Sequence, residues 1–385
     1  MAAPQTAVSD TTADGAFRRQ PAVFRERVSQ SGRYPPEGAC PQARIALRGC
    51  AARLAPNAFC TAGRYVLYVS LACPWASRCV AVRTLKGLES TVELVVTHPV
   101  WARTRPGKDE HCGWQFRSEG DEPVTNPVGY GPVSNPASRH GSATAHSPAR
   151  RRGSFPCDGC MPDPVAGVRF VRDLYELAGA TGEGVRFTVP VLFDKATKTI
   201  VSNESSDIVR MLNSEFNAFA SAPELELYPE ALRPAIDEVN SLVYDGINNG
   251  VYRCGFASSQ TAYEEAFHLL YASLERVESI LSKQRYIAGS QLTEADVRLF
   301  VTLIRYDEVY AVYFKTNGRL IREMPNTFAY VRELYQMPAI KTSVNMRHIK
   351  LHYYTSHPSL NVHAIVPVGC AVDMDAPHGR DRTFG

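Results

Sequence analysis

Hydrophobic positions follow one spacing in the first half of the chain and another in the second. Short runs rich in β-branched and aromatic residues predict strands, at residues 65–71, 92–97, 188–194 and 199–201. Segments with helical spacing predict helices between them, at residues 74–88, 168–177 and 203–212. From residue 229 the spacing is helical throughout, and one face repeats six apolar residues: Phe267, Leu270, Tyr271, Leu274, Val277 and Leu281. The pattern predicts an α/β half followed by an all-helical half.

Two segments depart from this order. Residues 120–164 hold 8 Pro and 6 Gly in 45 positions, a composition that buries too little apolar surface to fold by itself. We therefore expect a flexible insertion there. Residues 35–63, which include Cys40, Cys50 and Cys60, are expected to form an inserted or irregular approach to the first strand.

Composition excludes several classes of protein. The 385 residues are 44% hydrophobic and 21% charged, as in an ordinary globular protein. A net charge of +3 is too small and scattered to indicate nucleic-acid binding. The longest apolar runs are too short to span a bilayer, so no membrane partner is expected.

Cysteine usage indicates a reducing compartment. The ten cysteines form no disulfide framework, and residues 1–14 lack the pattern of a secretory signal. We expect a cytoplasmic protein, with organellar targeting left open by the arginines at positions 18, 19, 25 and 27.

The sequence Cys73-Pro74-Trp75-Ala76 stands between the first strand and the first helix. Pro74 suits the first helical position, which would hold the Cys73 sulfur at a helix N-terminus. The partial positive charge there is expected to lower the pKa of the thiol and favour the nucleophilic thiolate. The alternative is a buried cysteine that packs as a small hydrophobe.

The order of elements is typical of a thioredoxin-like fold, with the cysteine directly after the first strand. A thioredoxin-like half followed by helices resembles the architecture of a soluble glutathione transferase. The ranges expected are an N-terminal extension (1–63), a thioredoxin-like domain (64–213), an all-helical domain (228–350) and a C-terminal tail packed on it (351–385). A capping box at Thr293 and Asp296, with Leu292 against Val297, predicts one helix start in the second domain.

Further blocks resemble the glutathionyl-hydroquinone reductases, the xi class of glutathione transferases. They cover most of residues 64–118 and 168–385 and include Asn248-Asn249-Gly250-Val251-Tyr252-Arg253, His352-Tyr353-Tyr354 and Pro377-His378-Gly379-Arg380-Asp381. The resemblance implies that Cys73 attacks the sulfur of an S-glutathionyl hydroquinone and that a second glutathione resolves the mixed disulfide. It also implies glutathione as co-substrate, aromatic glutathionyl conjugates as substrates, a homodimer, and neither a metal nor a nucleotide cofactor.

The resemblance assigns glutathione contacts, and each has a structural alternative. Val189, before a cis proline, would pair with the cysteinyl part of glutathione, or it is an ordinary strand residue. Glu204 and Ser205 would bind the γ-glutamyl group at a helix start, or Ser205 is simply the N-cap. Trp114 would pack on glutathione or belong to the core, and Arg186 would neutralise a carboxylate or be solvated.

Tyr252 and Tyr353 correspond to the tyrosines that line the hydroquinone site in the family. They rest wholly on the resemblance, since the chain has 18 tyrosines. One departure lies close to the nucleophile: Ser77 stands where the family usually has His, and we expect a changed helix surface there without loss of activity.

Other cysteines and histidines carry weaker signals. Cys157 and Cys160 have the spacing of a metal knuckle, but no second Cys or His pair lies at zinc-finger distance, so a zinc site is disfavoured. His348 and His352, with His357 nearby, fall in a segment for which the resemblance implies no metal. Cys79 and Cys254 are expected to be structural.

Two other functions stay open. An omega-like thiol transferase or dehydroascorbate reductase would use Cys73 in the same way with a different second pocket. A non-catalytic glutathione transferase-like binding module is disfavoured because Cys73, Glu204 and Ser205 are all present.

Overall fold

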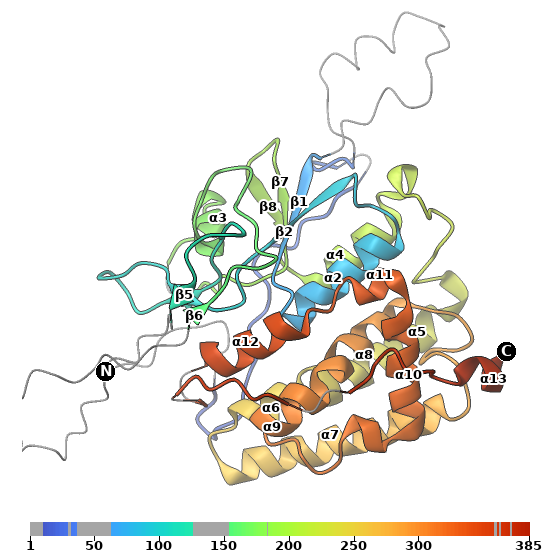
Figure 1. Cartoon of the computed structure of the whole chain (residues 1–385). Coiled ribbons are helices and arrows are strands. Elements are labelled where there is room, and N and C mark those ends of the chain that lie inside the picture. Colours follow the sequence, from blue (N-terminus) through green and yellow to red (C-terminus); the bar gives the residue numbers. More distant parts are fainter. Residues whose placement is uncertain are drawn as a thin grey trace, which may run out of the picture.

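The computed structural model describes residues 11–29, 32–36, 63–125, 154–182, 184–357, 360–361, 363–369 and 372–385. A four-stranded sheet with its helices forms one half of the molecule, and a helical bundle forms the other (Figure 1). Each half has its own hydrophobic core, and Leu85 and Leu292 pack against both. The predicted fold class is confirmed.

The sheet has the strand order β2-β1-β7-β8, with β1 (Tyr65–Val69) parallel to β2 (Val92–Val96) and antiparallel to β7 (Val191–Asp194). The edge strand β8 (Thr199–Ser202) pairs with β7. All five residues of β1 are buried, because helices cover both faces of the sheet (Figure 1). A central strand buried on both faces needs a continuous apolar run, which the sequence supplies.

The helix α2 (Pro74–Leu85) lies between the two halves of the molecule. It packs on α4 (Ser205–Ser214) on the sheet side and on α8 (Glu294–Arg305) and α11 (Pro338–Lys341) of the bundle. Nine of its twelve residues are buried, including Arg78 and Arg83. The helix that carries the Cys-Pro turn is therefore fixed by both domains.

The first turn of α4 differs from the expected one. The N-cap is Glu204, whose carboxylate accepts hydrogen bonds from the N–H of Ser206 (3.0 Å) and from its hydroxyl (2.7 Å). The alternative in which Ser205 caps the helix is therefore wrong. A carboxylate can fill this role because it accepts from N–H groups whose helical partners are missing.

The remaining elements are mostly helical. On the sheet side they are α3 (Val171–Leu177), which covers the sheet on the side away from α2 and α4 (Figure 1), and the short pairs β3 (Ala102–Arg103) with β4 (Cys112–Gly113) and β5 (Val124–Thr125) with β6 (Ser154–Phe155). The bundle adds α5 (Arg233–Val243), α6 (Gly250–Phe256), α7 (Gln260–Leu281), α9 (Ala311–Tyr313), α10 (Pro325–Gln336), α12 (Met346–Ser356) and α13 (Arg380–Phe384). Short 3-10 or π turns are η1 (Asn217–Phe219), η2 (Glu230–Leu232), η3 (Tyr244–Asn248), η4 (Tyr306–Tyr310) and η5 (Ile321–Glu323).

The predicted helical patterns of the bundle are confirmed. On α7, Leu270, Leu274, Val277 and Leu281 are buried, whereas Phe267 and Tyr271 pack only partly against the core. At the start of α8, the Asp296 carboxylate accepts hydrogen bonds from the N–H (2.8 Å) and hydroxyl (2.9 Å) of Thr293, as the capping box predicts.

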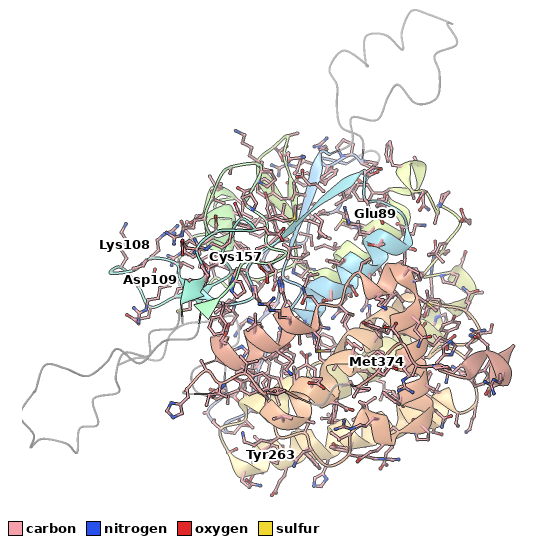
Figure 2. All side chains as sticks on the ribbon, in the orientation of Figure 1. Glu89, Lys108, Asp109, Cys157, Tyr263 and Met374 are labelled. Atoms are coloured by element: carbon pink, nitrogen blue, oxygen red, sulfur yellow. The ribbon has the colours of Figure 1, made fainter. Side chains whose placement is uncertain are left out.

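The two ends of the expected insertion pack against the folded protein. Cys157 and Cys160 are buried in a cluster with Val124 of β5. Cys157 lies near the β5–β6 pair (Figure 2). The buried Asp163 accepts a 2.6 Å hydrogen bond from the hydroxyl of Tyr68 on β1. Flexibility over the whole of 120–164 is therefore wrong for these ends, because a few apolar side chains and one carboxylate anchor them. Residues 126–153 of the insertion, and 37–62 of the approach to β1, lie outside the described residues.

Segments from both ends of the chain pack on the bundle. Phe17 lies against the rings of Tyr252 and Phe256, with centroids 6.2 and 5.7 Å away. In the tail, the buried Arg380 donates a 2.8 Å hydrogen bond to Glu333 on α10. The N-terminal contact brings the first described residues close to the Cys-Pro turn.

Candidate active site

Cys73 is the N-cap residue of α2 and directly follows the turn after β1. Pro74 occupies the first turn, as predicted. The thiol is half-buried and lies 3.5 Å from the carbonyl oxygen of Val189, to which it can donate its proton. The peptide bond between Val189 and Pro190 is cis, as the resemblance implied. These contacts join the Cys-Pro turn to the start of β7.

Burial raises the pKa of the Cys73 thiol, and this effect outweighs several opposing ones. Hydrogen bonds from the backbone of Ala76 and Trp75, and the positive charges of Arg305 and Arg19, act in the other direction. The prediction that the helix N-terminus leaves Cys73 with a lowered pKa is therefore wrong: the predicted donors are present, but desolvation of the sulfur is the larger effect.

Arg305, the last residue of α8, holds the turn that precedes Cys73. Its fully buried guanidinium donates hydrogen bonds to the carbonyl oxygens of Leu71 (3.0 Å) and Ala72 (3.2 Å) and to the hydroxyl of Ser77 (2.8 Å). Ser77 is itself fully buried. Ser77 therefore faces the domain interface, where its hydroxyl is bound by Arg305.

Three tyrosines from different helices form a hydrogen-bonded cluster. The hydroxyl of Tyr353 on α12 lies 2.5 Å from that of Tyr252 on α6 and 2.9 Å from that of Tyr310 in η4. Burial raises the pKa of all three phenols. They are therefore neutral near pH 7 and can donate protons. Sequence reasoning missed Tyr310, since nothing in its spacing separates it from other tyrosines.

Trp114 belongs to the core of the sheet side and also lines a cavity that contains Cys73. Trp114 is buried, and the centroid of its ring lies 4.5 Å from that of the His352 ring and 5.5 Å from that of the Trp101 ring. Burial lowers the pKa of His352 and lowers that of His357 to about 4. The aromatic wall formed by Trp101, Trp114, His352 and His357 is therefore uncharged at neutral pH.

A narrow cavity of about 60 Å³ brings many of these side chains together. Its lining consists of Arg19, Cys73, Pro74, Trp75, Trp101, Trp114, Thr188, Val189, Tyr252, His352, Tyr353 and His357. Five predicted site residues are among them, whereas Arg186, Glu204 and Ser205 are not. The carbonyl oxygen of Ser205 instead accepts from the thiol of the buried Cys79 (3.6 Å).

Several lining residues were missed as site residues by sequence reasoning. Trp75 is adjacent to the Cys-Pro pair, and Thr188 is adjacent to Val189. Their place beside predicted site residues was the available signal. Arg19 offered none, because it reaches the cavity from the N-terminal extension.

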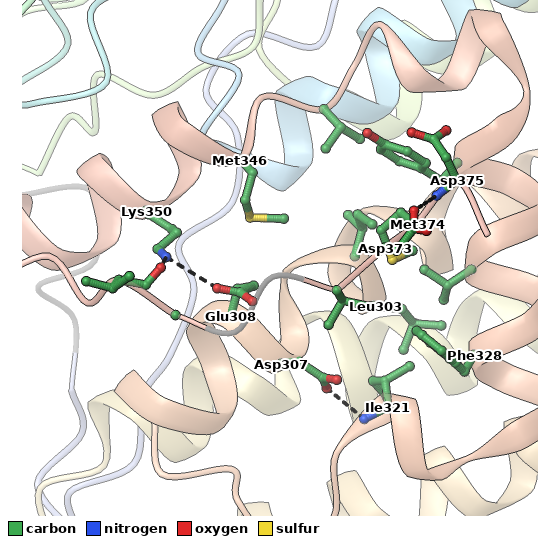
Figure 3. A pocket seen from close by; sticks show the side chains of 17 residues that line it. Leu303, Asp307, Glu308, Ile321, Phe328, Met346, Lys350, Asp373, Met374 and Asp375 are labelled. Atoms are coloured by element: carbon green, nitrogen blue, oxygen red, sulfur yellow. Dashed lines mark hydrogen bonds and ion pairs between the residues drawn. The ribbon is translucent and has the colours of Figure 1, made fainter.

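A larger cavity of about 460 Å³ lies in the bundle, between α8, η4, α10 and α12 and the tail (Figure 3). None of the described residues that line it is a cysteine. Two of its charged groups, Lys350 and Glu308, form an ion pair (3.3 Å), and the Asp307 carboxylate accepts the N–H of Ile321 (2.7 Å). By volume alone this cavity would be the first candidate for the active site. The narrow cavity is the better candidate because it contains the Cys73 nucleophile.

Within the described residues, no three His, Cys, Asp or Glu side chains are arranged to hold a metal ion. The same part of the chain contains no helix long and apolar enough to cross a membrane.

The thioredoxin-like half, the helical half and the cysteine at the Cys-Pro turn define a glutathione transferase. Two family models agree: the N-terminal domain of glutathione S-transferase matches residues 72–215, and the C-terminal domain matches residues 260–333.

Relatives and solved structures narrow the class. Glutathionyl-hydroquinone reductase YqjG of Escherichia coli (strain K12) is 38% identical over 96% of this chain and 94% of its own length. Glutathionyl-hydroquinone reductase PcpF of Sphingobium chlorophenolicum is 38% identical over 80% of this chain and 83% of its own. The xi glutathione transferase of Phanerochaete chrysosporium superimposes with a TM-score of 0.72 at 40% identity, covering 94% of this chain and 99% of that one. The chain belongs to the xi class of glutathione transferases, the family of the glutathionyl-hydroquinone reductases.

A solved structure of YqjG contains glutathione; it superimposes with a TM-score of 0.72 at 37% identity and covers 94% of this chain and 97% of that one. Glutathione, which is bound in that structure of a relative, is therefore the co-substrate expected for this chain.

Proposed function

We propose that this protein uses glutathione to reduce S-glutathionyl hydroquinones to free hydroquinones, with Cys73 as the nucleophile. The observation that carries the proposal is the shared cavity: the Cys73 thiol lies in it together with the neutral phenols of Tyr252 and Tyr353. A sulfur nucleophile and proton donors on one small aromatic-walled cavity are what this reaction requires.

In the first step the Cys73 thiolate attacks the glutathione sulfur of the conjugate. A disulfide between Cys73 and glutathione forms, and the bond between that sulfur and the aryl carbon breaks. The electron pair of the broken bond stays with the hydroquinone, whose ring carbon ends with a proton in place of sulfur. Tyr252 and Tyr353 are the proposed donors of that proton. A second glutathione then attacks the mixed disulfide, which releases oxidised glutathione and restores the Cys73 thiolate.

The proposed glutathione contacts are the backbone of Val189, the ring of Trp114, and the polar groups of Arg186, Glu204 and Ser205. Val189 and Trp114 line the cavity, which supports their part of the proposal. The last three do not line it, so their roles rest on the family alone. A homodimer in the cytoplasm is likewise proposed from the family.

The test is turnover of glutathionyl-menadiol with glutathione by the wild-type protein and by Cys73→Ser, followed by release of menadiol. The proposal expects turnover that disappears in the variant while glutathione binding is retained. No turnover by a folded, glutathione-binding wild type would contradict it.

A second candidate is an omega-like thiol transferase, since a relative from Schizosaccharomyces pombe (strain 972 / ATCC 24843), "Glutathione S-transferase omega-like 2", is 35% identical over 92% of this chain. It would favour hydroxyethyl disulfide or dehydroascorbate over glutathionyl-menadiol. Comparing kcat/KM for the three substrates on one preparation separates the two functions.

A further inference from the structure

Arg19 enters the cavity of Cys73 from the N-terminal segment of the chain. Its guanidinium carbon lies 4.5 Å from the centroid of the Trp75 ring and 5.0 Å from that of Tyr252. Its Nε donates a 2.9 Å hydrogen bond to the side-chain oxygen of Asn249. Two aromatic rings and one amide therefore fix the orientation of the guanidinium.

The rest of this segment is anchored close by. The carbonyl oxygen of Gly15 accepts a 2.9 Å hydrogen bond from the N–H of Ser258, and that of Asp14 accepts a 2.8 Å bond from the hydroxyl of Ser259. Phe17 packs on Tyr252. Arg19 is thus held in position by the bundle.

One nitrogen of this guanidinium has no partner. Nη2 is buried and meets no hydrogen-bond acceptor among the described residues, and no carboxylate in that part of the chain forms an ion pair with Arg19. A buried cationic donor without an acceptor is costly. The unpaired Nη2 of Arg19 is explained if it donates a hydrogen bond to an anionic oxygen of a ligand.

The position of Arg19 in the cavity indicates which part of the ligand supplies this anionic oxygen. Arg19 contacts Asn249 and Tyr252 on the bundle side of the cavity and Trp75 beside Cys73 on α2, whereas Val189, the proposed glutathione contact, belongs to the start of β7. We propose that Arg19 binds the phenolate oxygen of the departing hydroquinone and so determines selectivity for hydroxylated aromatic conjugates, an inference that rests on the proposed function.

The chemistry of the step requires such a group. A glutathionyl hydroquinone can react as its keto tautomer, in which the sulfur-bearing carbon has already gained a proton and the neighbouring hydroxyl has lost one. Attack by the Cys73 thiolate on sulfur then forms the disulfide and breaks the carbon–sulfur bond. The electron pair restores the aromatic ring and leaves the negative charge on oxygen, which later takes a proton. A fixed guanidinium stabilises charge that develops at this point.

The first test separates the two halves of the reaction. Arg19→Met keeps the length and apolar stem of the side chain and removes the charge. Because Arg19 also lowers the pKa of the Cys73 thiol, both proteins are compared at a pH where Cys73 is ionised. Release of menadiol from glutathionyl-menadiol in a single turnover should then slow at least 10-fold, while reduction of the Cys73–glutathione disulfide by glutathione should stay within twofold. Arg19→Lys should recover part of the loss. The exposed neighbour Arg18 provides the control, and Arg18→Met should leave both rates unchanged.

Equal slowing of both half-reactions would overturn the inference, because the guanidinium would then serve glutathione or the fold. Unchanged rates would overturn it as well.

The second test needs no turnover, so it stays informative if the proposed activity itself fails. Titration of 4-nitrophenol near its own pKa against the Cys73→Ser protein should increase the absorbance of the phenolate on binding. In the Cys73→Ser, Arg19→Met protein this increase should disappear. Binding of the phenolate that does not depend on Arg19 would reject the role of this residue as an oxyanion ligand.

Discussion

The guanidinium of Arg305 donates a 2.8 Å hydrogen bond to the hydroxyl of Ser77, 228 positions earlier in the chain. The bond crosses the interface between the bundle and the thioredoxin-like domain and lies one helical turn from Cys73. With the bonds to Leu71 and Ala72, it makes the bundle part of the scaffold of the nucleophile. Stability and thiol reactivity should therefore depend on the same side chain.

Replacing Arg305 by Met should lower both the stability of the protein and the reactivity of the Cys73 thiol. The carbonyl oxygens of Leu71 and Ala72 would lose a buried donor, which we expect to cost about 3 kcal/mol of unfolding free energy. Urea unfolding of wild type and variant measures this. The control is Arg276→Met, because Arg276 is 58% exposed in its ion pair with Glu238 and its loss should change the unfolding free energy by less than about 0.5 kcal/mol.

The same variant tests the electrostatics of Cys73. The positive charge of Arg305 lowers the pKa of the thiol, in opposition to burial. In Arg305→Met, the pH profile for alkylation of Cys73 by iodoacetamide should move to higher pH, and Arg305→Lys should move less. An unchanged profile in a folded variant would leave Arg305 with a purely structural role.

The tyrosine cluster predicts a graded effect on the release of hydroquinone. Tyr252 and Tyr353 line the cavity, whereas Tyr310 is not among its lining residues and places its hydroxyl 2.9 Å from that of Tyr353. Tyr252→Phe and Tyr353→Phe should each lower kcat by roughly 100-fold, which is within the usual range for loss of a general acid. Tyr310→Phe should cost much less. Single-turnover release of menadiol measures all three, and equal effects would contradict direct proton donation.

Acid should destabilise the protein through the buried histidines. Burial lowers the pKa of His357 to about 4, whereas in the unfolded chain it has the ordinary value of about 6.5. Between these values the unfolded state binds the extra proton, so stability rises with pH and is lost as pH falls from about 6.5 to 4. One such residue contributes about 3 kcal/mol over this window.

Urea unfolding as a function of pH checks this contribution. His357→Gln should flatten the dependence between pH 6.5 and 4. His268→Gln, at an exposed position on α7, should retain the wild-type slope. Identical slopes in the two variants would rule out His357 as a source of acid sensitivity.

Asp163 should stabilise the fold, although it lies in a segment of low-complexity composition. It accepts hydrogen bonds from the hydroxyl of Tyr68 (2.6 Å) and from the N–H groups of Val165 (3.0 Å) and Ala166 (3.0 Å). Asp163→Ala should cost about 2–4 kcal/mol of unfolding free energy, since the buried hydroxyl of Tyr68 and several part-buried N–H groups lose their acceptor. Asp158→Ala is the matched control, because the side chain of Asp158 is 58% exposed. A loss no larger than that of the control would show that this end of the segment is not part of the cooperative fold.

Local sequence alone predicted much of the architecture. The apolar run at 65–71, the Cys-Pro pair and the capping box at Thr293 specify their elements through interactions within a few residues. Each element formed where it was predicted, although the strand already ends at Val69. The cis peptide before Pro190 was implied by the family resemblance. Composition over 45 residues concealed the anchoring of residues 154–164, because a few buried side chains decide it.

Tertiary structure alone decided which distant side chains meet. Arg19, Tyr310 and Arg305 carry no local signal, and they reach the site only when the N-terminal segment and the bundle pack on α2. The net pKa of Cys73 was also fixed at this level. The sequence determined the helix N-terminus, whose local field favours the thiolate and lowers the pKa. Desolvation raises the pKa, and it depends on how closely both domains surround the sulfur. Of the two effects, desolvation is the larger.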